Sequence, residues 1–321
     1  MRKIYLALFI LGVTINIFIA VLQNYPGYMD ADYYLMGGEQ LANGNGFHEM
    51  VLWNYLDGQV RLPHPSNSYW MPLSSILTAI GLMIGRELIW GRMVFILMAG
   101  AISSMTAYVA YTFSKDKRGT IFAGLIATFS GFYLPFIGNT DTFGIYMLCG
   151  SVFLLLIQAM SEQKQLSGKY ILSFLVGMLA GLMHLSRADG ILWLGLAFLA
   201  VLVFAWRQRN WISLSLLSGI VLLGYLVVMG PWLIRNWQEF GTLLSPGGIK
   251  VLWLTNYDEL FAFPADKLNY AHWWSSGVPS IIKVRFWSLG QNLQTTRQRV
   301  PCGAYVPIST RTSKQTPSRA G

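Results

Sequence analysis

Seven apolar stretches of 17 to 21 residues recur along the chain, and they limit the fold more than any other feature of the sequence. They cover residues 4–22, 93–113, 120–138, 142–160, 170–186, 190–206 and 211–231. About 20 apolar residues cross a bilayer as a helix, so each stretch predicts a membrane span. Only 12% of the residues are charged and 54% are hydrophobic, too much apolar surface for one soluble core. The sequence therefore predicts an all-α, polytopic integral membrane helical bundle.

The first stretch shares one feature with a secretory signal peptide, because Arg2 and Lys3 precede it. However, residues 4–22 are longer than the apolar core of a typical signal peptide, and no small-residue cleavage site follows them. We expect an uncleaved first helix, and a cleaved signal peptide is the alternative.

Basic residues at the ends of the stretches predict the orientation of the chain. Nine of them fall at four sites, and these sites share one side if seven helices alternate: Arg2, Lys3, Lys115, Lys117, Arg118, Lys164, Lys169, Arg207 and Arg209. The side rich in Lys and Arg faces the cytoplasm. We therefore expect an N-terminus on the cytoplasmic side of the cell membrane. Residues 23–92, 139–141, 187–189 and everything after 231 then lie on the other side, here called the outer side.

The formal net charge of +9 has two sources: five of the charges lie in residues 291–321, and most of the remaining Lys and Arg lie in short loops between the apolar stretches. Basic residues that flank membrane spans serve orientation, so we expect the lipid bilayer as a partner and no nucleic acid. The two cysteines, Cys149 and Cys302, have neither a disulfide pattern nor the spacing of a metal site.

The first outer loop, residues 23–92, is far longer than the loops expected on the cytoplasmic side. It is rich in Trp, Tyr, Pro and Gly, which is too aromatic for a disordered segment, and long ordered loops are usually functional. Within it, residues 71–85 (MPLSSILTAIGLMIG) are apolar but short, and counting them as a span breaks the alternation of charge. We expect interfacial helices in this large loop. A true span at 71–85 is the alternative.

The pattern divides the chain into three parts. Residues 1–248 form the membrane module, and residues 249–296 hold segments that suggest amphipathic helices on the outer face. Residues 297–321 contain Arg297, Arg299, Arg311, Lys314 and Arg319, no acid and no apolar periodicity, which predicts a disordered or non-native tail. We expect a truncated chain or one whose reading frame has shifted near residue 295.

Polar residues gather on the outer side. They are Asp30, Asp32 and His64 in the first loop, Asp141 before the fourth stretch, His184, Arg187 and Asp189 around the end of the fifth, and Arg235 after the seventh. Ionisable residues near membrane depth are costly and tend to mark sites. A cluster of both signs indicates chemistry on an anionic substrate at the membrane surface.

Several of these residues also have purely structural explanations. Asp30 and Asp141 suit helix N-caps, and Asp189 suits a partner that neutralises Arg187. Arg187 and Arg235 suit anchors whose charged ends reach the lipid head groups. Arg92, which enters the second stretch, suits such an anchor best.

Five motifs follow one another in a recognisable order. They are MDADYY (29–34), HPSNSYWMPL (64–73), Arg92, RADG (187–190) and PWLIRNWQEFG (231–241). In this order and spacing the chain resembles the GT-C superfamily of membrane glycosyltransferases. The closest branch is similar to protein O-mannosyltransferases and the lipid A aminoarabinose transferase. The resemblance covers roughly residues 1–250.

The resemblance implies a sugar donor linked to a polyprenyl phosphate and an acceptor hydroxyl on a lipid, glycan or protein. The family usually has Asp-Glu where this chain has Asp30-Ala31-Asp32, and we align Asp30 with the catalytic carboxylate. Asp30 would take the acceptor proton. Asp32 would orient the acceptor, tune Asp30 or help to hold a metal.

The remaining candidates are expected to bind substrate. Arg187 and Arg235 present forks that match phosphate oxygens, so they would hold the donor phosphate. His64, Asp141 and Asp189 are further candidates for substrate contact. His64 with Asp30 or Asp32 also leaves a divalent metal open, although no spacing demands one.

Two other functions stay open at this point, a membrane transporter and an inactive fragment of a glycosyltransferase. A transporter predicts ionisable residues near the bilayer midplane and inverted repeats. The charges of this chain lie at helix ends, and no clear repeat is present.

Overall fold

Helices make up nearly all of the regular structure in the computed structural model, which describes residues 1–58, 61–163, 165–261 and 264–299. Six helices in these ranges are long and apolar enough to cross a membrane. They are α1 (Arg2–Leu22), α4 (Leu88–Ser114), α7 (Phe143–Glu162), α8 (Leu166–Ser186), α9 (Ile191–Gln208) and α10 (Trp211–Phe240). The expected all-α, multi-pass membrane bundle is confirmed.

The third expected span, residues 120–138, is a broken helix. α5 (Lys117–Thr128) is followed by η1 (Gly131–Tyr133) and α6 (Leu134–Ile137), and the two parts meet at an angle of 45°. Gly131 has a φ of 59° at the break, a conformation that glycine adopts without steric cost. Counted as one span, the two parts give a seventh crossing.

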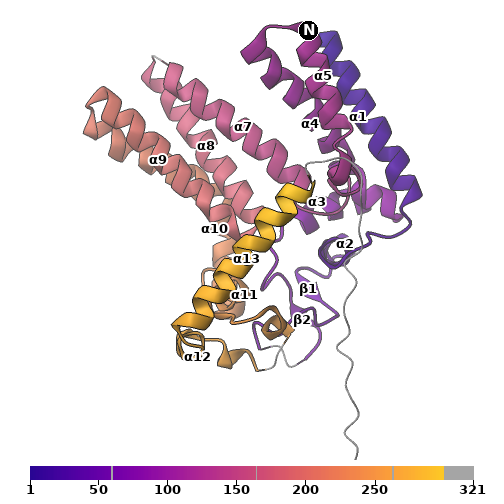
Figure 1. Ribbon diagram of the computed structural model, residues 1–321, viewed down its shortest axis with the longest axis vertical. Coiled ribbons are helices and arrows are strands. Elements are labelled where there is room, and N and C mark those ends of the chain that lie inside the picture. The colour runs from indigo at the N-terminus through magenta and orange to yellow at the C-terminus, as the bar shows by residue number, and fades with distance from the viewer. Residues whose placement is uncertain (59–60, 164, 262–263, 300–321) are drawn as a thin grey trace, which may run out of the picture.

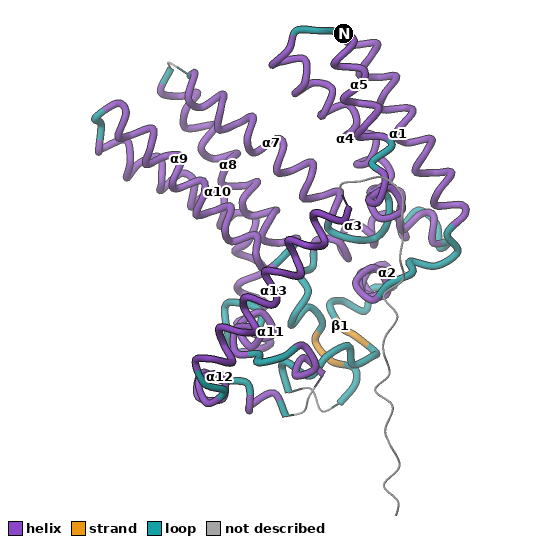
Figure 2. The backbone as a smooth tube through the Cα atoms, viewed as in Figure 1, coloured by secondary structure: helices purple, strands orange, loops and turns teal. Residues whose placement is uncertain are grey.

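Two groups of long helices spread apart from a common end (Figure 1). α1, α4 and α5 form one group and α7 to α10 form the other, and α4 packs against α7 between them. The N-terminus and the α4–α5, α7–α8 and α9–α10 ends lie together at the spread end. Short helices, strands and loops gather at the common end (Figure 2). The helix ends that carry the basic sites therefore share one end of the bundle.

The largest apolar core lies in the second group, where α8 crosses α10 at two glycines. A Cβ added to Gly177 would lie 2.0 Å from the backbone oxygen of Val221, and one added to Gly224 would lie 2.2 Å from that of Phe174. Such small residues let membrane helices approach closely.

The first loop folds over the common end. It contains α2 (Met29–Ala42), the antiparallel pair β1 (His48–Glu49) and β2 (His64–Pro65), and α3 (Leu73–Leu82). α3 packs against both α2 and α4. Its 10 residues rise roughly 15 Å, about half the hydrocarbon thickness of a bilayer. The short helix expected at 71–85 is therefore present, and it is too short for the alternative of a true span.

α10 extends well past the end expected at residue 231. Pro231 lies inside the helix, which ends only at Phe240, before Gly241 with a φ of 70°. Proline removes one backbone donor, but membrane helices tolerate it where neighbouring groups satisfy the freed carbonyl. Arg235 consequently belongs to a helix and not to a loop.

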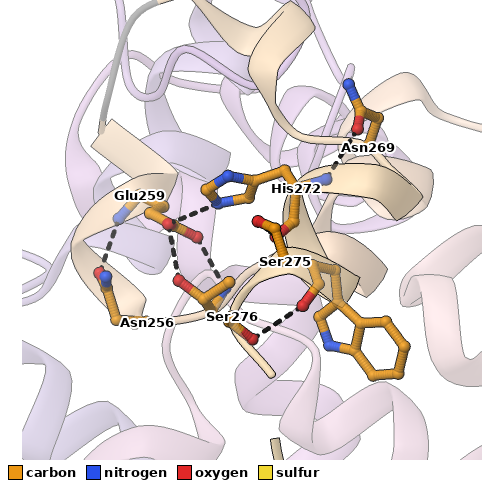
Figure 3. Close-up of polar contacts among 8 residues, drawn as sticks. Asn256, Glu259, Asn269, His272, Ser275 and Ser276 are labelled. Atoms are coloured by element: carbon orange, nitrogen blue, oxygen red, sulfur yellow. Dashed lines mark hydrogen bonds and ion pairs between the residues drawn. The ribbon is translucent and has the colours of Figure 1, made fainter. Parts of the chain in front are cut away.

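The chain after α10 forms short elements and one long helix. They are α11 (Pro246–Lys250), η3 (Val251–Trp253), η4 (Tyr257–Phe261), η5 (Ala265–Lys267), α12 (Tyr270–Ser275) and α13 (Val278–Arg299). Glu259 and His272 point toward each other across this segment, with Glu259 Oε1 2.8 Å from His272 Nε2 (Figure 3). Residues 297–299 of the expected tail end α13, and residues 300–321 lie outside the described residues.

Candidate functional site

A charged cavity lies at the common end of the bundle, where the first loop meets the α8–α9 junction. Its volume is about 250 Å³. It is lined by Asp30, Tyr34, Tyr69, Trp70, Met71, Asp141, Thr142, Arg187, Ala188, Asp189, Gly248 and Val251. Four of the seven residues expected at the site thus line one space: Asp30, Asp141, Arg187 and Asp189.

Asp30 enters the cavity from the first turn of α2. The N-cap of this helix is Tyr28, so the explanation of Asp30 as an N-cap is wrong. Asp30 Oδ1 accepts a 3.1 Å hydrogen bond from Trp70 Nε1. Burial and the nearby Asp141 carboxylate raise the pKa of Asp30 by more than Trp70 and Arg187 lower it. A carboxylate with a raised pKa holds a proton more firmly, which suits a general base.

Asp32 does not line this cavity. Residues two apart on a helix point to different sides, so α2 separates two carboxylates that the sequence places side by side. Burial raises the pKa of Asp32 as well. A joint action of Asp30 and Asp32 on one substrate atom finds no support in this arrangement.

Asp141 is buried and held by two donors. Its Oδ2 accepts a 2.7 Å hydrogen bond from the Tyr28 hydroxyl, and its Oδ1 accepts a 2.5 Å bond from the Thr142 backbone N–H. Burial and the charge of Asp141 raise the pKa of Tyr28, which keeps that hydroxyl a donor. α7 has Thr142 as its N-cap, so Asp141 is not the cap and instead places a fixed carboxylate beside Asp30.

Arg187 and Asp189 reach the cavity from the junction between α8 and α9. Arg187 Nε donates a 3.1 Å hydrogen bond to Asp189 Oδ1, and the Tyr146 hydroxyl donates another of 3.1 Å to the same oxygen. The guanidinium also lies over the Tyr146 ring, 5.6 Å from its centroid. The side chains of Arg187 and Asp189 are 45% and 55% exposed. This cation is therefore oriented by Asp189 and Tyr146 and remains accessible to a ligand.

Arg92 is bonded to the start of the first loop and is not an anchor in the lipid. It is 1% exposed. Its guanidinium donates to the backbone oxygens of Ala20, Gln23 and Tyr25 at 3.2, 2.8 and 2.9 Å, and to Asn139 Oδ1 at 3.1 Å. The expectation of a lipid-facing anchor is wrong, because Arg92 is buried in protein. Its acceptors are carbonyls at and just past the end of α1, which have no partner within that helix.

Two further contacts connect the turn before α7 with the start of the first loop. Asn139 Nδ2 donates to the Pro26 oxygen at 2.7 Å, and the Thr140 hydroxyl donates to the Ala31 oxygen at 2.9 Å. We call Arg92, Asn139 and Thr140 the buried clamp. It holds the residues on both sides of Asp30.

Arg235 does not share the cavity with Arg187. Its guanidinium lies 4.8 Å from the Trp232 ring, 4.9 Å from the Phe240 ring and 5.9 Å from the Phe47 ring. Its Nη2 donates to the Phe47 oxygen at 3.3 Å. The expectation that both arginines enter one cavity is not met, because the continued α10 carries Arg235 into this aromatic surrounding.

His64 also lies away from the cavity. Its Nε2 is 3.8 Å from Asp57 Oδ2, and its ring stacks on Phe240. In the described part of the chain, no three His, Cys, Asp or Glu side chains gather closely enough to hold a metal ion. The residues present therefore do not fit the metal site considered for His64 with Asp30 or Asp32, and no step proposed below uses a metal.

A smaller and mostly apolar cavity adjoins the charged one. The two share Met71, Ala188 and Gly248, and the smaller one is further lined by side chains such as Met229 and Trp232. His184 also lines it, with Nδ1 2.6 Å from the Tyr225 hydroxyl. The site thus combines a charged compartment with an apolar one.

Sequence reasoning missed several residues of the charged cavity. Trp70, Tyr28 and Tyr34 contact or neighbour the carboxylates, yet none of them was among the expected site residues. A usable signal existed, since Trp70 lies within HPSNSYWMPL and Tyr34 within MDADYY.

The fold and the cavity together define a polytopic membrane protein with a site of acids and an arginine where its spans end. A family model described as dolichyl-phosphate-mannose-protein mannosyltransferase matches residues 64–235, more than half of the chain. The chain belongs to this family and is a membrane glycosyltransferase of the GT-C type. Comparisons with curated proteins and with solved structures found no match.

The matched range contains Trp70, Asp141, Arg187, Asp189 and the clamp residues, and it begins after Asp30. Family membership favours the glycosyltransferase over the transporter. It leaves the roles of the individual cavity residues to the geometry.

Proposed function

We propose that the chain transfers a sugar from a polyprenyl-phosphate donor to an acceptor hydroxyl in the charged cavity. The observation that carries this proposal is that Asp30, with its raised pKa, and the accessible Arg187 line one space at the end of the membrane spans. An acid and a cation in one cavity provide the two functions that such a transfer needs.

The donor side of the reaction suits Arg187. A polyprenyl tail stays in the bilayer, so its phosphate must lie where the spans end. A guanidinium fork matches phosphate oxygens and strengthens its hold as the leaving phosphate gains a second negative charge. The adjoining apolar cavity gives hydrocarbon next to that phosphate a place to lie.

The acceptor side suits Asp30. The acceptor oxygen forms a bond to the sugar C1 while the bond from C1 to the phosphate oxygen breaks. The acceptor proton passes to Asp30 and later to water, and polyprenyl phosphate leaves. The hydrogen bond from Trp70 Nε1 to Oδ1 orients the carboxylate and leaves its other oxygen for the acceptor.

The other cavity residues suit the sugar itself. Asp141 and Asp189 present carboxylate oxygens to a space that also contains the rings of Tyr69 and Trp70. Carboxylates accept hydrogen bonds from hydroxyl groups, and aromatic rings offer flat apolar surfaces. Three carboxylates beside one guanidinium favour a sugar with several donor groups, and the acceptor is a hydroxyl on a lipid, glycan or protein.

We place this reaction on the outer side of the cell membrane, with residues 1–248 as the catalytic module and the N-terminus in the cytoplasm. The basic helix ends support this orientation, because they share the end of the bundle opposite the cavity. A cysteine introduced at Asn24 should react with an impermeant reagent from outside the cell. Reaction from the cytoplasmic side alone would contradict the orientation.

The decisive experiment replaces Asp30 in proteoliposomes that contain polyprenyl-phosphate mannose labelled in the sugar, with a membrane extract as the acceptor source. Asp30→Asn removes the base and keeps the shape, so turnover should fall roughly 10²–10⁴-fold while donor binding persists. In the wild type, turnover should be lost as Asp30 becomes protonated at acidic pH. Because the pKa of Asp30 is raised, this loss should begin at a higher pH than for an ordinary aspartate. Glu39→Gln, an exposed change on the same helix, should leave turnover unchanged.

Asp32→Asn distinguishes the role of Asp32 from that of Asp30. Near-normal turnover in Asp30→Asn together with collapse in Asp32→Asn would move the role of base to Asp32. Near-normal turnover in both variants would overturn the catalytic assignment of this helix.

A further inference from the structure

A second binding feature lies at the opposite end of the bundle from the charged cavity. A groove of about 440 Å³ runs between α7 and α9. Its walls are apolar, formed by Leu154, Ile157, Met160, Leu196, Leu199, Ala200, Val203 and Phe204, and Ser161 and Arg207 close its far end. Because both helices are membrane spans, the groove is open to lipid.

The length of this groove matches one leaflet. Along α9 it extends from Leu196 to Arg207, which is a rise of roughly 16 Å at 1.5 Å per residue. Half of a bilayer's hydrocarbon core is about 15 Å thick. An acyl chain that lies in the groove would therefore reach from the midplane to the head-group level, where Arg207 is located.

A buried cation adjoins the same end. Lys169 is only 8% exposed, and its Nζ lies 4.4 Å from the centroid of the Phe204 ring that lines the groove. Among the described residues the Lys169 ammonium has no hydrogen-bond or ion-pair partner. The nearest acid in sequence, Glu162, is exposed and accepts a hydrogen bond from Gln158. With no anionic partner among the described residues, this cation leaves a position beside the groove that a lipid phosphate would complement in charge.

We infer that the groove between α7 and α9 binds an anionic glycerophospholipid of the leaflet opposite the catalytic cavity. One acyl chain occupies the apolar groove, and the phosphate lies between Lys169 and Arg207. In the described part of the chain neither cation has an acidic partner, which favours a head group with net negative charge over a zwitterionic one. The site is separate from the sugar-transfer reaction and does not depend on its residues.

The test measures lipid retention by native mass spectrometry on purified protein offered phosphatidylglycerol or phosphatidylcholine in equal amounts. The wild type should retain phosphatidylglycerol preferentially. The double variant Lys169→Gln, Arg207→Gln should bind it roughly thirtyfold more weakly, since each basic residue near the membrane surface contributes about fivefold. The matched control is Lys117→Gln, Arg118→Gln, which removes two basic residues at the same end of the bundle but outside the groove, and it should keep the preference.

A second variant tests the groove without changing charge. Ala200→Phe adds an apolar side chain to the wall and should reduce retention of phosphatidylglycerol while the protein stays monodisperse and helical. Equal retention of both lipids by the wild type would overturn the inference. So would equal losses in the Lys169/Arg207 and Lys117/Arg118 variants.

Discussion

The buried clamp and the segment after α10 both lie at the cavity end of the bundle, but they are held in different ways. Arg92 makes four hydrogen bonds, and its partners at Ala20, Gln23 and Tyr25 lie about 70 positions away in the chain. In the later segment, Glu259 bonds with Thr255 and His272, both of which are close in sequence. α13 exposes apolar side chains along its length.

This difference indicates that the clamp region is held in a single geometry, whereas the segment after α10 can adopt more than one. A buried polar network is costly when partly satisfied, so it favours a single geometry. The Glu259 bonds are part-buried but join residues close in sequence, and such local bonds can open at a lower free energy than the whole fold. The clamp holds the loop that carries Asp30, which is where a small displacement would impair chemistry most.

The largest effect is expected when the clamp itself is broken. Arg92→Gln removes the charge and leaves several buried carbonyls without a donor, so it should lower the free energy of unfolding by about 3 kcal/mol. Turnover should fall as well, because the residues around Asp30 lose their support. Thermal unfolding in detergent, followed by circular dichroism, measures the first effect, and the labelled-donor assay measures the second.

The matched control for this prediction is Arg86→Gln. Arg86 is exposed and donates to Asn43 on the same end of the bundle. Its replacement should change the free energy of unfolding by roughly 0.5 kcal/mol or less. Equal losses in the two variants would show that the clamp has no special role.

The bundle could be predicted from the sequence because the bilayer imposes a length on every span. The break at Gly131 and the continuation of α10 through Pro231 could not, since a glycine or a proline in an apolar stretch is compatible with either a break or a continued helix. The general location of the site could also be predicted, because Asp30, Asp141, Arg187 and Asp189 were each placed at an outer helix end.

The details of the site depended on contacts that no local pattern contains. From the sequence alone Arg92 suits a lipid anchor, because its acceptors, carbonyls at and just past the end of α1, are distant in the chain. Asp32 resembles a partner of Asp30 until α2 turns the two apart, and helical spacing alone would have separated them. Arg235 resembled Arg187 because the expected end of α10 placed it in a loop.

The next smaller effect is expected at Arg187 and Arg235. Comparing the two variants tests whether both arginines or only Arg187 contact the donor. Arg187→Lys keeps the charge but loses the planar fork, so donor affinity should weaken about tenfold. Arg235→Lys should act mainly on stability, because its surroundings are three aromatic rings. Equilibrium binding of labelled polyprenyl-phosphate mannose to both variants checks the comparison. Equal loss of affinity in both would place Arg235 back in the donor site.

The smallest effect is expected in the segment after α10. Burial alone raises the pKa of Glu259, but hydrogen bonds from the Thr255 N–H and hydroxyl and from His272 lower it further than burial raises it. A carboxyl with a depressed pKa stabilises its surroundings above its unfolded pKa, and this contribution is lost as pH falls through the folded pKa. Protection of residues 255–275 against hydrogen exchange should therefore weaken at acidic pH.

Glu259→Gln should remove this dependence on pH and cost the segment about 1 kcal/mol at neutral pH. The neighbouring, exposed Asp258→Asn provides the control and should keep the wild-type behaviour. Exchange protection is measured relative to that control, which cancels the intrinsic effect of pH on exchange. Because only local bonds are lost, turnover and the protection of α2 should stay unchanged. A simultaneous loss of protection in α2 would show that the two regions form one cooperative unit and do not open independently.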